Sequence, residues 1–129
     1  MIRLILAFPL LFAACQKDES VSGYADSNAI YVLQEINGHA FVSRATLHFP
    51  EAGKVQGDAP CNAYFATQTV PYPWIRIENI AVTKRICPDF SAESKFFAAL
   101  SAMTLVEVLG DTLILSNDDD TEMVFESAQ

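Results

Sequence analysis

The 129-residue sequence is poor in several residue types, and each shortage excludes a class of protein. With only 5 Gly and 6 Pro, the chain lacks the composition of collagen-like and other fibrous repeats. Its 8 Lys and Arg are outnumbered by 16 Asp and Glu, which gives a formal net charge of −8 and no basic footprint for nucleic acid. The hydrophobic share of 51% is too high for a disordered chain, so one folded domain is expected.

The apolar run at the start of the chain is too short to cross a membrane. It spans residues 4–14 and follows a single positive charge at Arg3, whereas a membrane-spanning helix needs about 20 apolar residues. Its length suits the apolar region of a secretory signal, and the small residues Ala13 and Ala14 suit a cleavage site. The sequence therefore predicts export, with cleavage just before Cys15.

Small residues leading into Cys15 resemble a bacterial lipobox, although Phe12 stands where that signal usually has Leu. The resemblance implies a signal peptide over residues 1–14 and a diacylglyceryl group on the sulfur of Cys15. Gln16 replaces the Asp that retains many such proteins in the inner membrane. This implies a lipid-anchored protein at the bacterial outer membrane that faces the periplasm. The alternative is an ordinary secretory signal that leaves Cys15 as a free thiol.

The next segment, residues 16–28 (QKDESVSGYADSN), is polar and has no apolar period, which predicts a flexible tether over residues 15–28. A domain over residues 29–129 follows, in which short β-like runs alternate with turn signals such as Asn37-Gly38. The runs predicted to be strands are residues 30–36, 44–49, 54–57, 62–70, 74–80, 113–116 and 122–126.

One stretch, residues 92–106, has the apolar spacing of a helix, and Asp89 or Ser91 is expected to cap its start. Its apolar face is formed by Phe96, Phe97, Leu100 and Met103. Together the elements predict an α+β domain: an antiparallel sheet or open barrel of about seven to eight short strands, with one α-helix packed on it.

Several short motifs follow one another in a fixed order along the domain. The most specific is a Gly-x-x-x-Cys-Asn-x-Tyr pattern over residues 57–64, and the strand 31–38 before it opens with Tyr31 and ends in a Gly turn. Further members of the series are Leu47, Phe49, Thr83, Cys87, Glu93, Phe96, Leu100, Gly110, Leu113, Leu115, Met123 and Phe125. The series resembles the META domain family, which includes the HslJ-like lipoproteins. Family members usually have Trp where this chain has Tyr31.

The resemblance implies a cracked β-barrel with a helix across it, in an envelope protein that has no known catalytic site. Family members are associated with stress and drug tolerance, and their biochemical activity is largely undefined. At greater distance the family is similar to secretion pilotins, small lipoproteins whose barrels hold an acyl tail or a secretin segment. A pilotin-like or acyl-chain-binding module is therefore the alternative function.

Three Cys are an odd number, and the lipid anchor accounts for one of them. The remaining pair, Cys61 and Cys87, is expected to form a structural disulfide in an oxidising periplasm. The chain-entropy model gives such a bridge about 3.5 kcal/mol. A redox or metal site is the alternative, and it is disfavoured because there is no Cys-x-x-Cys motif and no nearby His.

Four residues are candidates for contact with a ligand or partner: Asn62, Thr83, Lys84 and Arg85. A basic pair in so acidic a chain suits lipid phosphate or a protein partner. The alternatives are a solvated loop for the basic pair and, for Asn62, a side chain that bonds to the backbone of a turn.

The sequence predicts no catalytic residue, metal site or cofactor. The acidic residues 118–120 lack the ligand spacing and the Gly of an EF-hand loop, the two His are separated, and no Ser lies in a Gly-x-Ser-x-Gly elbow. The function expected is therefore non-enzymatic: binding or scaffolding with an unknown envelope protein, in envelope maintenance or stress tolerance.

Overall fold

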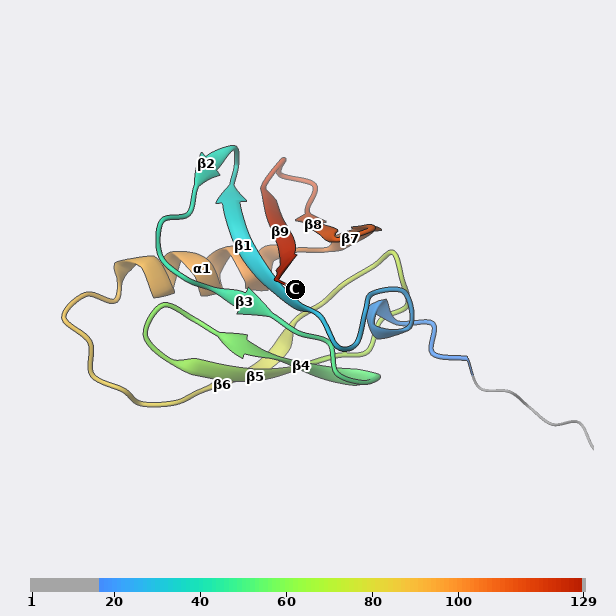
Figure 1. The fold of residues 1–129 in the computed structure, drawn as a ribbon, viewed down its shortest axis with the longest axis horizontal. Coiled ribbons are helices and arrows are strands. Elements are labelled where there is room, and N and C mark those ends of the chain that lie inside the picture. Colours follow the sequence, from blue (N-terminus) through green and yellow to red (C-terminus); the bar gives the residue numbers. More distant parts are fainter. Residues whose placement is uncertain (1–16, 129) are drawn as a thin grey trace, which may run out of the picture.

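Antiparallel strands in two sheets and one α-helix make up the fold, which confirms the α+β class predicted from the sequence (Figure 1). The computed structural model describes residues 17–128. The strands of this part are β1 (Ile30–Ile36), β2 (His39–Ala40), β3 (Thr46–Leu47), β4 (Gly53–Asp58), β5 (Ala63–Gln68), β6 (Glu78–Val82), β7 (Leu105–Leu109), β8 (Thr112–Ser116) and β9 (Glu122–Ala128). The helices are the short 3-10 helix η1 (Val21–Gly23) and α1 (Ser91–Ala102).

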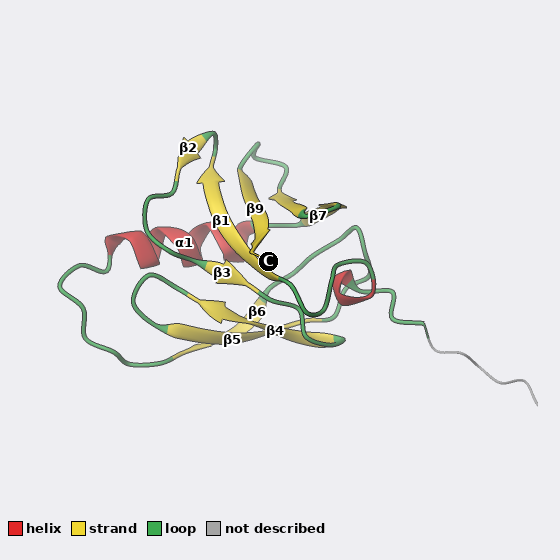
Figure 2. Ribbon diagram, viewed as in Figure 1, coloured by secondary structure: helices red, strands yellow, loops and turns green. Residues whose placement is uncertain are grey.

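The two sheets approach each other at two places. The larger sheet has the order β2-β1-β9-β8-β7, with β3 also paired to β1, and the smaller sheet has the order β4-β5-β6. Just after β3, His48 pairs with Gln56 of β4, and Trp74 in the segment before β6 pairs with Leu105 of β7. The sheets thus curve into an incomplete barrel, and α1 runs between them (Figure 2).

Side chains from both sheets and from α1 fill the interior. In β1, Tyr31 and Leu33 point inward because the side chains of a strand alternate between its faces. From α1, Phe96 and Leu100 are completely buried, and the Phe96 ring packs edge-on against Tyr64 of β5 with centroids 5.7 Å apart. The helix therefore closes the barrel by burying its apolar face.

The predicted hairpin turns are present. Asn37 and Gly38 both have positive φ angles, 52° and 77°, which is the conformation of a tight two-residue hairpin turn. The side-chain oxygen of Asn37 also accepts a hydrogen bond from the backbone N–H of Glu122 (2.8 Å), so the turn is tied to the start of β9. The polar loop between β8 and β9 forms the second predicted hairpin.

The strand predicted over residues 30–36 keeps its bounds, most other predicted strands shift by one or two residues at an end, and two elements change further. The helix predicted over residues 92–106 ends at Ala102, where Met103 takes an extended conformation (ψ 140°). Leu105–Leu109 becomes β7 because its alternating Leu and Val residues pair with β8. The strand predicted over residues 74–80 begins only at Glu78, although Ile75 and Ile77 alternate inward as expected.

The polar segment predicted as a tether is partly packed on the domain. Val21 is buried in the core, the backbone N–H of Tyr72 donates to the carbonyl of Glu19 (2.7 Å), and the ring of Tyr24 stacks on that of Tyr72 at 4.2 Å. The packed domain therefore begins before residue 29, because one apolar side chain in a polar stretch is enough to hold it against the barrel.

Residues 1–16, with the predicted signal peptide and lipidation site Cys15, lie outside the described residues. In the part of the chain that is described, no helix has the length and apolar character needed to cross a membrane.

Gly57 of β4 has no room for a side chain, and this yields a first prediction. A Cβ at this position would lie 2.2 Å from the carbonyl oxygen of Thr46, in the place where the Tyr64 hydroxyl donates to the same oxygen (2.6 Å). We expect Gly57→Ala to lower the free energy of unfolding by about 2 kcal/mol, the usual cost of overpacking a filled interior. Urea unfolding measures the change.

The matched control for this variant is Lys54→Ala, on the same strand, where the side chain is exposed and makes only a surface ion pair with Glu51. Its unfolding midpoint should stay close to that of the wild-type chain. An equal effect of the two variants would contradict the steric account of Gly57.

Candidate functional site

A buried carboxylate joins the helix to the turn between β4 and β5. Glu93, in the first turn of α1, is only 6% exposed. Its Oε1 accepts hydrogen bonds from the backbone N–H groups of Cys61 (3.1 Å) and Asn62 (2.8 Å), and its Oε2 accepts one from the side-chain amide of Asn62 (3.0 Å). Three donors therefore satisfy the charge that burial removes from water.

The same Asn62 extends this network to the segment after β6. Its side-chain oxygen accepts hydrogen bonds from the Thr83 hydroxyl (3.0 Å) and from the backbone N–H of Arg85 (2.6 Å). The Thr83 hydroxyl oxygen in turn accepts one from the backbone N–H of Ala63 (3.2 Å). We refer to Glu93, Asn62 and Thr83, with the backbone groups that they bind, as the Glu93 network.

The predicted disulfide between Cys61 and Cys87 crosses the same region and is confirmed in the structure, with the two Cα atoms 6.1 Å apart. It covalently joins the β4–β5 turn to the segment before α1, which the Glu93 network already holds by hydrogen bonds. Covalent and polar links therefore fix the same two segments.

Hydrogen bonding sets the protonation state of the network. Burial alone would raise the pKa of Glu93, but the hydrogen bonds from Asn62 and Cys61 together outweigh it and lower the pKa below its ordinary value of 4.5. Nearby, burial and the Asp58 carboxylate raise the pKa of Tyr64, so its hydroxyl stays protonated and donates to Thr46. Both groups therefore have a fixed proton state near neutral pH.

A surface pocket of about 430 Å³ lies beside the Glu93 network. Its lining residues are Arg44, Asp58, Ala59, Pro60, Cys61, Asn62, Ala63, Thr83 and Arg85. Two guanidinium groups thus border one hollow, from the loop before β3 and from the segment after β6. A pocket with this lining suits an anionic group of a ligand or partner better than a neutral one.

The structure brings together most of the residues predicted as possible contacts. Asn62, Thr83 and Arg85 line one pocket, and the exposed Lys84 is not part of its lining. Asn62 is buried, and its side-chain amide and carbonyl are both engaged within the protein. Thus Asn62 acts on the shape of the site, whereas Arg85 keeps its side chain on the surface.

Two residues of the site were not predicted to belong to it. Arg44 lies in an irregular loop, and no sequence signal ties it to residues 40 positions away. Glu93 sits in the first turn of a helix, where an acidic side chain favours the helix dipole and is normally solvated. Its neighbours along the chain do not reveal that it turns inward to meet a β-turn, so only the fold identifies its role.

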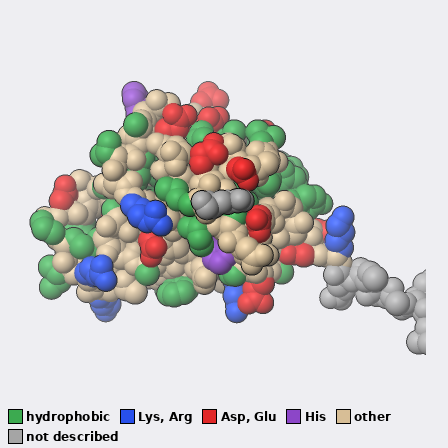
Figure 3. Space-filling view, in the orientation of Figure 1, with side chains coloured by type: hydrophobic (Ala, Val, Ile, Leu, Met, Phe, Trp, Pro, Cys, Tyr) green, Lys and Arg blue, Asp and Glu red, His purple; other side chains and the backbone are tan. Residues whose placement is uncertain are grey.

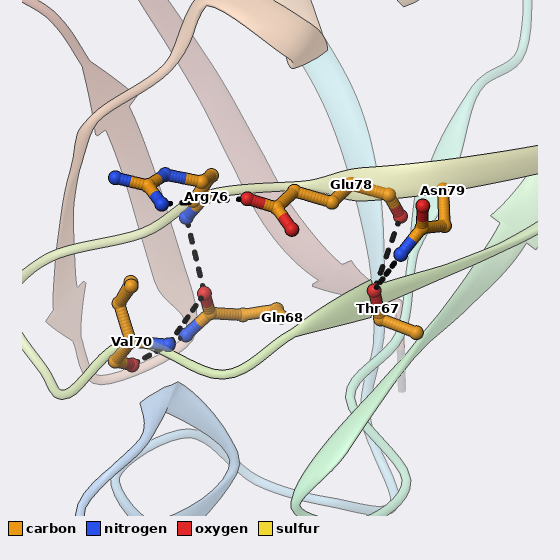
Figure 4. Close-up of polar contacts among 6 residues, drawn as sticks. All are labelled: Thr67, Gln68, Val70, Arg76, Glu78 and Asn79. Carbon is orange, nitrogen blue, oxygen red and sulfur yellow. Dashed lines mark hydrogen bonds and ion pairs between the residues drawn. The ribbon is translucent and has the colours of Figure 1, made fainter.

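A second hollow, a groove of about 700 Å³ with both apolar and polar walls, lies where the segment before β6 passes between the two sheets. Its apolar lining consists of Val70, Pro71, Trp74, Ile75, Ile77 and Met103. Figure 4 shows how the wall is held: buried Gln68 accepts a hydrogen bond from the backbone N–H of Arg76 (3.0 Å) and donates one to the carbonyl of Val70 (2.7 Å). The Arg76–Glu78 ion pair (3.4 Å) lies along the same wall.

In the part of the chain that the structure describes, side chains fill the interface between α1 and the sheets. The helix side chains Phe96 and Leu100 have no exposed surface, and Met103 just beyond the helix is 2% exposed. The groove beside Trp74 offers an apolar ligand more room than this filled interface.

Other polar residues of the sequence have local roles. At the tip of the β8–β9 hairpin, the Asn117 side chain accepts hydrogen bonds from the backbone N–H groups of Asp119 and Thr121. His48 lies within hydrogen-bond distance of the carbonyl of Ser27 (2.7 Å) and of the Gln56 amide (3.2 Å). Among residues 17–128, no three His, Cys, Asp or Glu side chains gather where they could hold a metal ion.

The chain folds as an incomplete α+β barrel in which Glu93 of the helix binds the Cys61-Asn62 turn. The chain belongs to the META domain family, whose model, described as META domain, matches residues 25–129. This confirms the family that the motif series resembles. No curated protein matches the chain.

Solved structures are similar to this chain at low sequence identity. A protein from Burkholderia xenovorans, determined by NMR, gives a TM-score of 0.62 at 16% identity and covers 80% of this chain and 83% of its own. A second NMR structure gives 0.60 at 17% identity, covering 78% and 89% of the two chains. A DUF4847 family protein from Bacteroides vulgatus gives 0.53 at 19% identity, covering 64% and 57%. These likenesses show the fold alone.

The Glu93 network yields a prediction with a pH dependence. Glu93→Gln should lower the free energy of unfolding at pH 7 by about 2 kcal/mol, because the neutral amide places an N–H group where a donor of Cys61 or Asn62 needs an acceptor. Since folding lowers the pKa of Glu93, its contribution is present above the ordinary value and is lost as the pH falls through the lowered one. The gap between wild type and variant should therefore narrow in acid.

Urea unfolding at a series of pH values measures this gap. Glu107→Gln, an exposed carboxylate on β7, is the matched control and should show no gap at any pH. A constant difference between wild type and Glu93→Gln down to pH 2 would show that the charge of Glu93 is not what the network depends on.

Proposed function

We propose that this META domain protein is a lipid-anchored, non-enzymatic component of the bacterial envelope that acts by binding another envelope protein. The proposal rests on the different roles of the polar side chains around the Cys61-Asn62 turn. Asn62 and Glu93 are engaged in holding the backbone, while the arginines beside them face outward around a pocket.

This division of roles favours binding over catalysis. A catalytic acid, base or nucleophile must be free to exchange a proton or form a bond with substrate. The carboxylate of Glu93 instead accepts hydrogen bonds from three donors within the protein, and the Tyr64 hydroxyl donates to Thr46. The pocket-lining Arg44 and Arg85 supply charge and hydrogen-bond donors, which serve recognition.

The anchor in this proposal rests on the N-terminal sequence. Two or three acyl chains on Cys15 provide stable anchoring, since each buried methylene contributes about 0.8 kcal/mol and one chain alone binds only marginally. Because residues from Glu19 onward pack on the barrel, the tether between anchor and domain is short. The domain is thus held close to the membrane in one general orientation.

The proposal predicts two effects of Cys15→Ala. The variant should leave the membrane fraction, because it lacks the sulfur that carries the lipid. It should also form fewer adducts with other envelope proteins when intact cells are treated with a chemical crosslinker, because the released domain no longer stays beside its partner. Fractionation, intact mass and immunoblotting of crosslinked cells measure both effects.

Cys61→Ser/Cys87→Ser, which leaves Cys15 in place, is the control and should keep both its lipid mass and its membrane partition. If Cys15→Ala is processed and partitioned like the wild-type chain, the anchor is absent. If the wild-type chain forms no heteromeric adduct in cells, the binding function fails.

The groove beside Trp74 supports a second candidate function, the binding of an apolar ligand such as an acyl chain. Its volume of about 700 Å³ lies within the range of small-molecule sites, and six of its eleven lining residues are apolar. Trp74 is 56% exposed and is the single Trp of the chain, so its fluorescence reports on this groove alone. A pilotin-like or carrier role requires that an acyl chain cover this ring.

Titration with palmitate therefore tests the second candidate. A bound chain should exclude water from Trp74, shift its emission to shorter wavelength and saturate at about one ligand per protein. Val70→Glu, which introduces a charge into the groove wall at a partly exposed position, should abolish the shift. Emission that does not change over the titration removes this candidate.

A further inference from the structure

Three apolar side chains stand out from one end of the molecule. Val42 is 97% exposed, Ile86 is 93% exposed and Phe90 is 44% exposed. They come from the loop between β2 and β3, the loop between β6 and α1, and the residue before α1. Contact between the rings of Phe41 and Phe96 (6.4 Å) brings the first loop beside α1, and Figure 1 shows all three segments at the same end.

The loop that carries Ile86 is fixed on both sides. Before it, the backbone N–H of Thr83 donates to the carbonyl of Ala63 (3.1 Å), and that of Arg85 donates to Asn62 (2.6 Å). After it, Cys87 is bonded to Cys61. An apolar side chain held outward on so constrained a loop is prepared for contact, because little conformational entropy remains to be lost on binding.

Basic side chains surround these apolar ones. Arg44, Lys84 and Arg85 belong to the same two loops, and they are three of the seven Lys and Arg residues in the described part of the chain. The acidic neighbours here include Asp58 in the pocket, Asp89 before the helix and the buried Glu93. Figure 3 shows basic side chains gathered at this end, while most of the acidic ones lie elsewhere on the same face.

We propose that this basic–apolar end, formed by Val42, Arg44, Lys84, Arg85, Ile86 and Phe90, is the surface that binds a partner protein through an acidic segment containing apolar residues. The apolar side chains pack against those of the partner, and the three cations pair with its carboxylates. Charge complementarity selects the partner, because the chain's other surfaces are predominantly acidic and repel an acidic segment.

The direction of the surface favours a protein over a lipid membrane, and this step rests on the proposed lipid anchor. The described N-terminal residues and η1 lie at the end of the molecule opposite the basic–apolar end (Figure 1). A domain anchored through a short N-terminal tether therefore points Ile86 away from the membrane that holds it, into the periplasm.

Site-specific photocrosslinking in the full-length, processed chain tests the proposal. A photoreactive amino acid replaces Ile86 in one variant and Leu109 in the control, which is also exposed (57%) but lies at the β7–β8 turn. We expect the Ile86 position to give a protein adduct that the Leu109 position lacks, and the crosslinked peptide, sequenced by mass spectrometry, to carry an excess of Asp and Glu.

Charge reversal supplies the second arm of the experiment. In the Ile86 crosslinking variant, Lys84→Glu/Arg85→Glu should reduce the adduct at least roughly tenfold, because like charges then face each other across the interface. Lys54→Glu, which reverses an exposed charge on β4, should leave the adduct unchanged. If the double reversal unfolds the domain, Lys84→Gln/Arg85→Gln takes its place with the same direction of effect.

The inference would be overturned if the crosslinked peptide were basic or neutral, or if only phospholipid were crosslinked. It would also be overturned if charge reversal left the amount of adduct unchanged, or if Ile86 gave no more adduct than the Leu109 control. Failure of the inference is distinguishable from failure of the proposed function. If a photoreactive amino acid at Trp74 gives protein adducts and one at Ile86 gives none, this surface is rejected and a binding function remains. Absence of protein adducts from every position rejects both.

Discussion

The hydrogen bonds received by one buried carboxylate hold the different parts of this fold together. Glu93 is presented by a helix, yet its partners belong to a turn between two strands. A buried charge without partners costs several kcal/mol, so the turn must take the conformation that aims its N–H groups at the helix. Asn62 also accepts a hydrogen bond from the segment after β6, and the Cys61–Cys87 bridge joins that segment to the turn covalently. Helix, turn and loop are therefore positioned as one unit.

The family motif can be explained residue by residue in these terms. Gly57 leaves space for the Tyr64 hydroxyl to reach the Thr46 carbonyl, which joins the smaller sheet to β3. Cys61 and Asn62 connect the turn to the disulfide and to Glu93. Each position of the pattern thus answers a packing or hydrogen-bonding requirement of the barrel, and its residues are specific because backbone atoms approach closely there.

Sequence reasoning succeeded where the physical signal is local. The bounds of β1, the Asn37-Gly38 turn and the inward-facing Phe96 and Leu100 of α1 follow from side-chain periodicity and turn chemistry, and the structure agrees with them. It failed where a distant partner decides. By sequence pattern the residues after Met103 continue the helix, but pairing with β8 makes Leu105–Leu109 a strand. The packing of Val21 on the core could not be predicted, because Val21 lies in a polar segment.

The candidate site, like the fold, could be predicted from the sequence only where the signal is local. Asn62, Thr83 and Arg85 could be chosen from the sequence because they flank the two cysteines. The carboxylate that binds Asn62 lies 31 positions further along the chain, on a helix. Because the family motif specifies the scaffold, membership of the family predicts the fold but not the partner. Since these polar residues hold the barrel together, they specify the fold and do not by themselves identify a partner. The loop bearing Ile86 is fixed at its base by this network and by the disulfide, while Ile86 itself lies outside the motif series.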